Sequence, residues 1–403
     1  MQSSRLRSKI SRISYDSLLQ QLDALLVETK SLWQPEPFKT ARPEWCDQYP
    51  ELTRALLALD EDSVNLYGSD HSALITFSSA YLPALSAIPT LIELPGKEQR
   101  QHELIEPQLH AGIPGRKWSQ IKSLYACIAN PQLAITEWCG GKGYLGRLLS
   151  GRWQQPVTTL EYNRDLVDSG RKLAGKYNVD QQFKAVDVLN DPVSDYLKDH
   201  HPIALHACGD LHRELVKQII ETKTPSFTIV PCCYHLGRDR EYRPFSSGLK
   251  LQLSREALRL AVNETVTANN REIEKRSREM AYQLGFQQLR EAISGNADYI
   301  SFNPVPKTWL KENFASYCKK LCAREGVPLP AKVEWERWQV RGEQRRFEVK
   351  RLQLLRQCFK RALELWLIMD MVAHFEDHGY SVNVSLFCER TLTPRNIVIE
   401  GKR

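Results

Sequence analysis

The 403-residue sequence lacks several features that would assign it at once to a broad class. It has no internal repeat or low-complexity tract, and no apolar run approaches the roughly 20 residues that a membrane-spanning helix needs. Residues 1–19 are basic but have no apolar core or cleavage site, so we expect no secretory signal. The ten cysteines include no C-x-x-C pair. We therefore expect a globular cytoplasmic protein with reduced thiols and no membrane contact.

Positive charge is present in excess and is unevenly placed. The net charge is +7, and residues 250–350 hold 19 Lys and Arg against 13 Asp and Glu. Residues 1–249 hold 28 Lys and Arg against 29 Asp and Glu. The basic segment is therefore a candidate surface for an anionic partner such as RNA.

Within that segment three arginines recur at i, i+4 spacing, namely Arg337, Arg341 and Arg345, with Trp338 between them. A positive stripe with an aromatic side chain is typical of phosphate contact combined with base stacking. Interleaved glutamates such as Glu343 are equally typical of a solvated, salt-bridged helix face. The spacing leaves both interpretations open, and we take the three arginines as candidate substrate-binding residues.

The middle of the chain alternates short apolar runs with helical patterns. The apolar runs are LAIT (133–136), VTTLE (157–161), FKAVDV (183–188), IALHACG (203–209) and SFTIVPCCYH (226–235). Helical patterns follow the first four, at 144–149, 165–177, 192–198 and 211–222. This alternation predicts an α/β fold with a parallel sheet and right-handed crossovers.

The flanking regions have a different texture. Residues from about 10 to 105 have mostly helical patterns, and a long helix is expected over 354–377, followed by strands at 380–389 and 397–401 with a short Pro-containing turn between them. The expected division is a helical lobe (1–110), a core (111–249), a basic helical insertion (250–351) and a return to the core (352–403). An antiparallel final strand is typical of the methyltransferase variant of this architecture.

The segment GKGYLG (141–146) fits the pattern G-x-G-x-x-G. Gly141 and Gly143 let the backbone turn sharply and approach a ligand. The helix expected from Tyr144 would direct its dipole toward a pyrophosphate or a carboxylate. NAD and S-adenosylmethionine (SAM) both fit this loop, but Glu137 suits the cationic amino group of SAM and has no obvious use beside a pyrophosphate.

Two further carboxylates end the next expected strands. Glu161 lies 18 residues beyond Gly143, and an acid near this spacing suits the ribose hydroxyls of NAD or SAM. Asp187 could accept from an adenine amino group. A solvated loop residue for Glu161 and a turn or N-cap carboxylate for Asp187 are the alternatives.

HACGD (206–210) and PCCYH (231–235) end two strands that should be neighbours. One edge of the sheet would then gather Cys139, His206, Cys208, Cys232, Cys233 and His235. C-C-x-H is not a standard zinc spacing, so we expect no metal and instead expect inert thiols around a nucleoside pocket. Tyr234 and His235 are the candidate catalytic residues, because His can deprotonate a hydroxyl or amine at neutral pH. A structural, hydrogen-bonded His is the alternative.

These segments, together with GYSVNVSLFCERTLTPRNIVIEG (379–401), resemble the SAM-dependent methyltransferase-like family that includes the methyltransferase-like domain of glutathione S-transferase C-terminal domain-containing protein. The HxCG and CCxH segments are also similar to a eukaryotic tRNA 2′-O-methyltransferase family. The resemblance covers roughly 112–240 and 352–403 and implies a class I (Rossmann-like) methyltransferase sheet with SAM as cofactor. It implies that the methionine part is held by Glu137, Gly141 and Gly143, the ribose by Glu161 and the adenine by Asp187, with Cys139, His206 and Cys208 beside the cofactor. Cys139 stands where many methyltransferases have a glycine, and this family often has Cys there.

A basic pair precedes the first strand, Arg116 and Lys117 in GIPGRKWSQI. This pair could meet an anionic substrate or the SAM carboxylate, or it could be a solvated helix start. The sequence favours a SAM-dependent methyltransferase acting on RNA, either tRNA or rRNA. A protein or small-molecule substrate, a non-catalytic binding module and an NAD(P) oxidoreductase are the alternatives.

Overall fold

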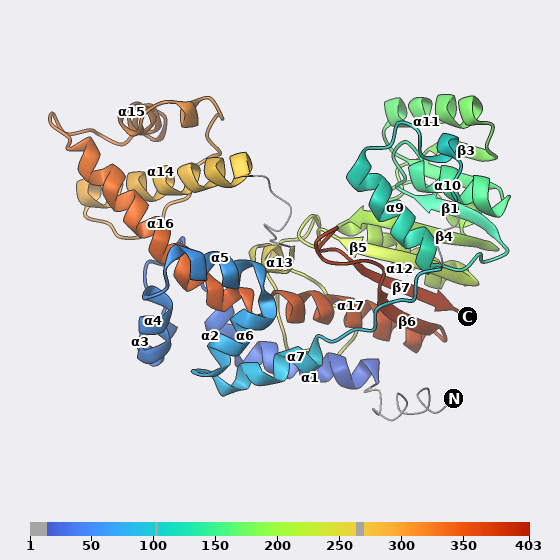
Figure 1. Cartoon of the computed structure of the whole chain (residues 1–403), viewed down its shortest axis with the longest axis horizontal. Coiled ribbons are helices and arrows are strands. Elements are labelled where there is room, and N and C mark those ends of the chain that lie inside the picture. Colours follow the sequence, from blue (N-terminus) through green and yellow to red (C-terminus); the bar gives the residue numbers. More distant parts are fainter. Residues whose placement is uncertain (1–13, 101–103, 263–269) are drawn as a thin grey trace. The chain divides into compact units, whose positions relative to one another are not determined.

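The five apolar runs form neighbouring parallel strands in a seven-stranded sheet of order β3-β2-β1-β4-β5-β7-β6. The computed structural model describes residues 14–100, 104–262 and 270–403 (Figure 1). The strands are β1 (Ala134–Trp138), β2 (Val157–Glu161), β3 (Gln181–Ala185), β4 (His200–Cys208), β5 (Ser226–Cys232), β6 (Ser381–Leu386) and β7 (Ile397–Lys402). β7 runs antiparallel to both β5 and β6. The predicted class I methyltransferase sheet with antiparallel final strands is confirmed.

Helices cover both faces of this sheet, because alternate side chains of each strand point to opposite sides. On β5, Val230 joins a buried cluster with Leu124 of α9 and Leu148 of α10. Phe227, on the other face, stacks on Phe375 of α17 with ring centroids 4.1 Å apart. The helices around the sheet are α1 (Tyr15–Glu28), α8 (Pro107–His110), α9 (Gly115–Cys127), α10 (Tyr144–Trp153), α11 (Arg164–Tyr177), α12 (Asp210–Thr222), α13 (Arg255–Val262) and α17 (Lys360–Asp377).

The chain divides into two compact units whose boundaries differ from the expected division. Unit 1 holds the sheet and comprises 1–27, 90–264 and 360–403. Unit 2 is helical and combines 28–89 with 265–359. The expected N-terminal lobe is therefore shared between the units. Most of α1 belongs to unit 1, where Asp23 accepts hydrogen bonds from Trp366 Nε1 and from the backbone N–H groups of Lys250 and Leu251.

Two expected helices differ from those observed. Residues 192–198 contain only the short 3-10 helix η2 (Ser194–Tyr196). The helix expected over 354–377 is divided into α16 (Trp335–Gln357) and α17, which belong to different units. Apolar periodicity continues through the break, so the sequence pattern alone shows one helix there.

Unit 2 is built around the pair α14 and α16. Its elements are α2 (Lys30–Trp33), α3 (Trp45–Gln48), α4 (Pro50–Leu57), α5 (Glu61–Ser69), α6 (His71–Ser79), η1 (Pro83–Ala87), α14 (Asn270–Ser294), η3 (Trp309–Lys311), α15 (Phe314–Glu325) and α16, with α7 (Ile88–Leu91) at the boundary. A Cβ on Gly342 would lie 2.4 Å from Ala281 O and 2.9 Å from Gly285 Cα, so two glycines allow α14 and α16 to pack closely.

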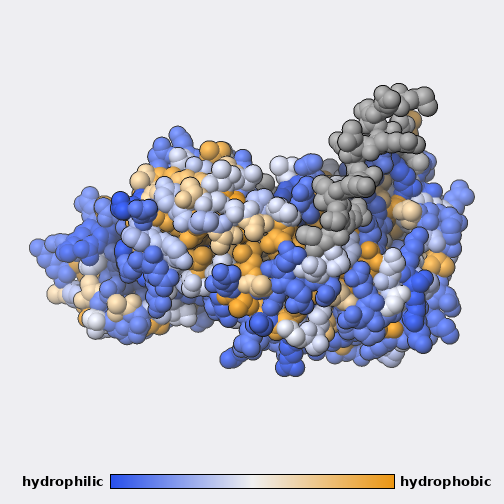
Figure 2. Space-filling view, turned by 90° about the horizontal axis from the view of Figure 1, so that it is seen from below, coloured by the Kyte–Doolittle hydropathy of each residue, from blue (hydrophilic) through white to orange (hydrophobic). Residues whose placement is uncertain are grey.

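None of the described helices is long and apolar enough to cross a membrane. On the face drawn in Figure 2, hydrophilic residues cover most of the surface and hydrophobic residues gather in smaller patches between them.

Candidate active site

The loop between β1 and α10 has three residues in the left-handed backbone region. These are Cys139 (φ 54°), Gly141 (φ 62°) and Gly143 (φ 69°). Glycine adopts this conformation without strain, whereas Cys139 bears a cost of roughly 1 kcal/mol. A Cβ built on Gly141 would meet no atom within 4 Å. The loop therefore presents an open backbone surface at Gly141, as a ligand cradle requires.

Glu137 lies beneath this loop and not on its open side. Its side chain is buried (3% exposed), and Oε2 accepts from Thr159 Oγ1 at 2.8 Å and Gln181 Nε2 at 3.4 Å. A Cβ on Gly140 would fall 2.5 Å from its Cδ. Burial is the main reason that the pKa of Glu137 is raised to about 7. This position corrects the expected direct contact with the cofactor amino group, because the carboxyl group supports the loop from behind.

Glu161 and Asp187 end the next two strands. Glu161 accepts from the backbone N–H groups of Gly141 and Asn163, both at 2.9 Å, so its carboxylate lies beside the glycine loop. Asp187 accepts hydrogen bonds from Leu189 N at 3.1 Å and from the side-chain amide of Asn190 at 2.7 Å. Its carboxylate is thus engaged in the turn after β3, which was the alternative interpretation of this residue.

The Cys139 thiol lies close enough to Glu161 and Asp187 for their charges to act on it. Burial, together with the nearby Glu161, Cys208 and Asp187, raises the pKa of this thiol to about 12. The ends of β1, β2, β3 and β4 therefore bring their predicted side chains to one edge of the sheet. A thiol with so high a pKa is inert as a nucleophile at neutral pH.

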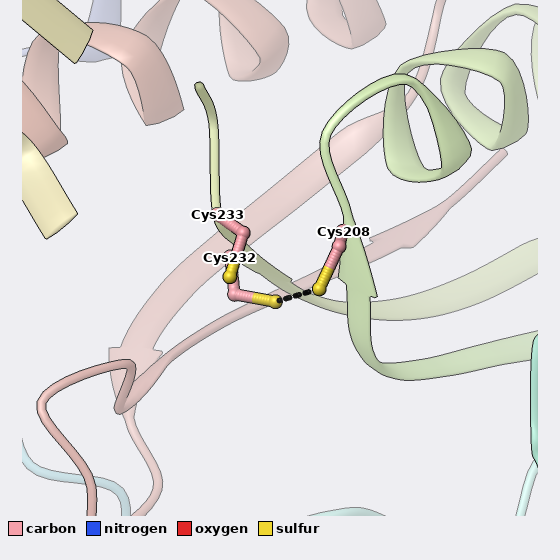
Figure 3. Close-up of side chains that lie close together, drawn as sticks. All are labelled: Cys208, Cys232 and Cys233. Carbon is pink, nitrogen blue, oxygen red and sulfur yellow. Dashed lines mark hydrogen bonds between the residues drawn. The ribbon is translucent and has the colours of Figure 1, made fainter. Parts of the chain in front are cut away.

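The ends of β4 and β5 bring three thiols together (Figure 3). Cys208 and Cys232 are Cα partners across the parallel pair, and their Sγ atoms are 3.3 Å apart. Cys233 follows directly in the left-handed region, with φ 48°. The three Sγ atoms lie within 4.8 Å of one another.

His206 lies at an irregularity in β4, between Leu205 and Cys208, with φ 65°. Its Nε2 is 3.0 Å from Gln120 Oε1, and burial lowers its pKa to about 4. Its Nδ1 is buried and has no hydrogen-bond partner among the described residues. At neutral pH the ring is therefore uncharged.

The two candidate catalytic residues line a pocket of about 500 Å³ after β5. Tyr234 is 5% exposed, and its ring meets His212 edge to face at 5.5 Å. Burial raises its pKa well above the ordinary tyrosine value, so it remains protonated. His235 is half-buried, and its Nδ1 has no partner in the described part of the chain. Burial, with the charges of nearby arginines, lowers the pKa of His235, so it is a neutral base at pH 7.

Arg213 of α12 lines the same pocket and was not predicted. Its guanidinium lies 4.6 Å from the ring centroid of Tyr242 and 4.1 Å from that of Phe245. Nη2 donates to Arg243 O at 2.6 Å, whereas Nη1 is buried without a partner among the residues described. This N–H of Arg213 suits an anionic ligand. The pocket also holds carboxylates, namely those of Asp210, Glu214, Asp239 and Glu241.

Arg116 and Lys117 are exposed in the first turn of α9. Arg116 Nε donates to Leu392 O at 3.1 Å. Lys117 Nζ lies 5.0 Å from the ring centroid of Tyr144, the first residue of α10. Lys117 therefore lies beside the helix that follows the glycine loop.

The predicted arginine stripe in unit 2 is only partly a surface. Arg337 and Arg341 are exposed and flank Trp338, with guanidinium-to-ring distances of 5.4 and 5.2 Å. Arg345 is 9% exposed and donates to Pro37 O at 2.6 Å. It therefore contributes to packing within unit 2, which corrects its expected role in substrate contact.

Unit 2 also joins the basic insertion to an acidic segment. Residues 265–359 carry 18 Lys and Arg against 11 Asp and Glu, whereas 28–89 carry 4 against 9. α16 packs on α2, α4, α5 and α6 of that acidic segment. Much of the expected positive excess is therefore compensated within the unit.

The comparison with known families concerns the same segment of unit 1. Residues 116–240 match the model of a family described as a methyltransferase domain. No curated protein matches the chain. The family match, the sheet order and the glycine loop indicate a SAM-dependent methyltransferase domain in unit 1. SAM fits the residues present, because Gly141 offers an open backbone cradle and the Glu161 carboxylate lies beside it.

Similar experimental structures include the following three. The tRNA (uracil-54, C5)-methyltransferase of Pyrococcus abyssi, in complex with S-adenosyl-L-homocysteine, is 20% identical, with a TM-score of 0.24 over 28% of each chain. Coclaurine N-methyltransferase, bound to N-methylheliamine and S-adenosyl-L-homocysteine, is 12% identical, with a TM-score of 0.25 over 86% of this chain and 89% of that one. The cyclopropane synthase MmaA2 of Mycobacterium tuberculosis is 11% identical, with a TM-score of 0.24 over 87% and 96%.

Proposed function

We propose that this methyltransferase acts on RNA and that the acceptor enters the pocket after β5. The observation that carries the proposal is the pocket itself. It places a neutral histidine, His235, and a desolvated cation, Arg213, next to the sheet edge that holds the glycine loop. A nucleotide supplies both groups that these residues suit, a hydroxyl or amine acceptor and a phosphate.

On this proposal the cofactor is held by the open side of the glycine loop. The backbone at Gly141 and Gly143 would hold the methionine part and Glu161 the ribose, whereas the Asp187 carboxylate, engaged in the turn after β3, would face the adenine only through a free lone pair. SAM supplies an already activated methyl group, so the protein mainly positions the acceptor for in-line transfer. Glu137 fixes the loop from beneath by its hydrogen bond to Thr159.

His235 would take the proton that a hydroxyl or protonated amine acceptor releases. Its Nδ1 has no partner in the described part of the chain, and its lowered pKa keeps it deprotonated at neutral pH. Tyr234 would form the pocket wall, because its buried hydroxyl stays protonated.

The RNA substrate is supported by the position of exposed cations. Arg116 and Lys117 lie in the first turn of α9, with Lys117 beside the helix that follows the glycine loop, and Arg337 and Arg341 flank Trp338 in unit 2. The exposed guanidinium groups of Arg337 and Arg341 can contact phosphate, whereas Trp338 is 8% exposed and anchors them on the core of unit 2.

Calorimetric titration with SAM, and separately with NAD, tests the cofactor assignment. We expect SAM to bind and NAD not to bind. Glu161→Ala should weaken SAM binding, whereas Asp168→Ala, an exposed carboxylate of α11 paired with Arg171, should leave it unchanged. Equal affinity in the two variants would contradict the role of Glu161.

Transfer of radiolabelled methyl groups from SAM to total tRNA and rRNA tests the substrate. Incorporation into protein or small molecules alone would overturn the RNA proposal. His235→Ala should bind SAM normally but transfer methyl groups much more slowly, whereas His378→Ala, an exposed histidine after α17, should resemble the unmodified chain. Normal turnover in His235→Ala would remove it as the base.

A further inference from the structure

We propose that Cys208, Cys232 and Cys233 form a binding site for a soft divalent metal ion, with zinc as the expected ion and one coordination position left for a non-protein ligand. The sequence favoured inert thiols here, because C-C-x-H is not a standard zinc spacing. The structure provides what the spacing could not, a third thiol from the neighbouring strand (Figure 3).

The distances between the sulfur atoms suit a tetrahedral centre. Zinc binds thiolate sulfur at about 2.3 Å, which places two sulfurs of one tetrahedral site about 3.8 Å apart. The three Sγ atoms lie within 4.8 Å of one another, and Cys208 and Cys232 are 3.3 Å apart. Shifts of roughly half an ångström would therefore bring all three to bonding distance of one ion.

The backbone holds the three thiols on the same side. Successive side chains of a strand alternate between faces, so Cys233 should point away from Cys232. The left-handed conformation of Cys233 (φ 48°) interrupts that alternation and returns its sulfur to the other two. A left-handed non-glycine residue costs on the order of 1–3 kcal/mol, and strain of this kind is concentrated at functional sites.

The loops that carry the thiols are tightly fitted to each other. Gly209 N donates to Cys232 O at 3.3 Å, and Gly209 has φ 57°. A Cβ on Gly209 would lie 2.2 Å from Leu236 O, so only glycine permits this approach. The sulfurs are therefore positioned before a ligand arrives, which lowers the cost of binding.

The surroundings suit a centre with net negative charge. Three thiolates and one Zn²⁺ leave a charge of −1, and the charge of Arg395 acts on both Cys208 and Cys233. Arg395 forms no ion pair with a carboxylate in the described part of the chain, and its Nε is buried without a partner there. No described His, Asp or Glu offers a fourth ligand atom within the same 4.8 Å, so the fourth position falls to water or another small donor.

Metal analysis of the full chain tests this site. The protein is purified under reducing conditions, dialysed against buffered Zn²⁺ and assayed for zinc, and we expect one ion per chain. Loss of a group that only supports a metal ligand costs roughly 10–100-fold in metal affinity. Loss of a ligand itself should cost at least as much, so Cys208→Ser or Cys233→Ser should weaken zinc binding by more than about tenfold. Cys388→Ser, a partly exposed thiol outside the cluster, is the matched control and should bind zinc normally.

Titration of the unmodified chain with Co²⁺ gives a second readout that needs no variant. We expect thiolate-to-cobalt charge-transfer bands together with the intense visible bands of a tetrahedral site, and Zn²⁺ should abolish both. Absence of stoichiometric zinc or cobalt in the reduced protein would overturn the proposal. It would also be overturned if the cluster variants bound zinc as tightly as the Cys388→Ser control, or if Cys208 and Cys232 formed a disulfide in the presence of zinc.

Discussion

Replacement of Glu137 by Gln should change how the stability of unit 1 depends on pH. The carboxyl group is buried beneath the glycine loop, and its pKa is raised from 4.5 to about 7. The folded state therefore holds this proton more tightly than the unfolded chain does. As the pH rises from about 4.5 to 7, the unfolded chain loses the proton first, so stability falls with rising pH. Glutamine has nearly the same shape and does not titrate in this range.

The magnitude follows from the difference in pKa. Each pKa unit corresponds to about 1.4 kcal/mol. Between about pH 5 and pH 8, the titration of Glu137 should remove about 2.5 kcal/mol of unfolding free energy, and Glu137→Gln should not show this loss. All other titrating groups are common to both chains and cancel in the difference. The stability difference between variant and unmodified chain should therefore shift by that amount in favour of the variant.

Urea unfolding at about pH 5, 6, 7 and 8, read by pulsed hydrogen exchange of peptides from β1 and β2, reports unit 1 separately from unit 2. Asp168→Asn, an exposed carboxylate on α11, is the control and should give a nearly constant difference. Parallel stability curves for Glu137→Gln and the unmodified chain would refute the argument, because they would mean that Glu137 is already ionised in the folded state.

Three other predictions concern stability. His201 is buried against two hydroxyls of β5, and burial lowers its pKa from 6.5 to about 3. The stability that neutral His201 provides above pH 6.5 is therefore lost as the pH falls, by about 3 kcal/mol at about pH 4. Acid unfolding of His201→Gln should shift to lower pH, and an unchanged acid unfolding curve would contradict this. Gly146→Ala should lower the free energy of unfolding by about 2–4 kcal/mol, because its Cβ would lie 2.5 Å from side chains beneath the loop. Gly175→Ala in α11 would meet nothing within 4 Å and should be neutral or slightly stabilising. Equal melting temperatures of the two variants would contradict this. Arg345→Ala should destabilise unit 2 by about 1–3 kcal/mol with little direct effect on RNA binding. Arg341→Ala should change stability by no more than about 0.5 kcal/mol but weaken RNA binding and reduce its salt dependence. The reverse pattern would place Arg345 on the surface.

The sheet could be predicted well because its strands are buried on both faces and read as continuous apolar runs. VTTLE matches β2 (Val157–Glu161) at both ends. Glu161 could be placed because its position depends only on the length of one helix and one strand. Glu161, which the spacing from Gly143 singled out, accepts the hydrogen bond from Gly141 N.

The orientation of Glu137 could not be predicted in the same way. Its place at the end of β1 was clear, but its direction depends on side-chain alternation in β1 and on the left-handed turn at Cys139. Neither the alternation nor the turn leaves a pattern in the spacing of residues along the sequence. The contact with Gln181 joins side chains 44 positions apart, and no local pattern indicates it.

The arginine stripe failed for a geometric reason. Four residues of α-helix turn through about 400°, so each i, i+4 step advances about 40° around the axis. Arg345 therefore lies about 80° from Arg337, far enough to leave the exposed face and reach Pro37. The acidic helices that cover α16 come from a segment about 300 positions earlier, which periodicity cannot reveal.

The order of the strands has a consequence for synthesis on the ribosome. β7 is the last strand to be made, yet it lies between β5 and β6 and pairs with both. Until β7 emerges, β5 has an unpaired edge and β6 has no neighbour within the sheet. The nascent chain therefore carries an open, aggregation-prone edge from the end of β5 at Cys232 until β7 begins at Ile397, and the sheet can close only as one late event.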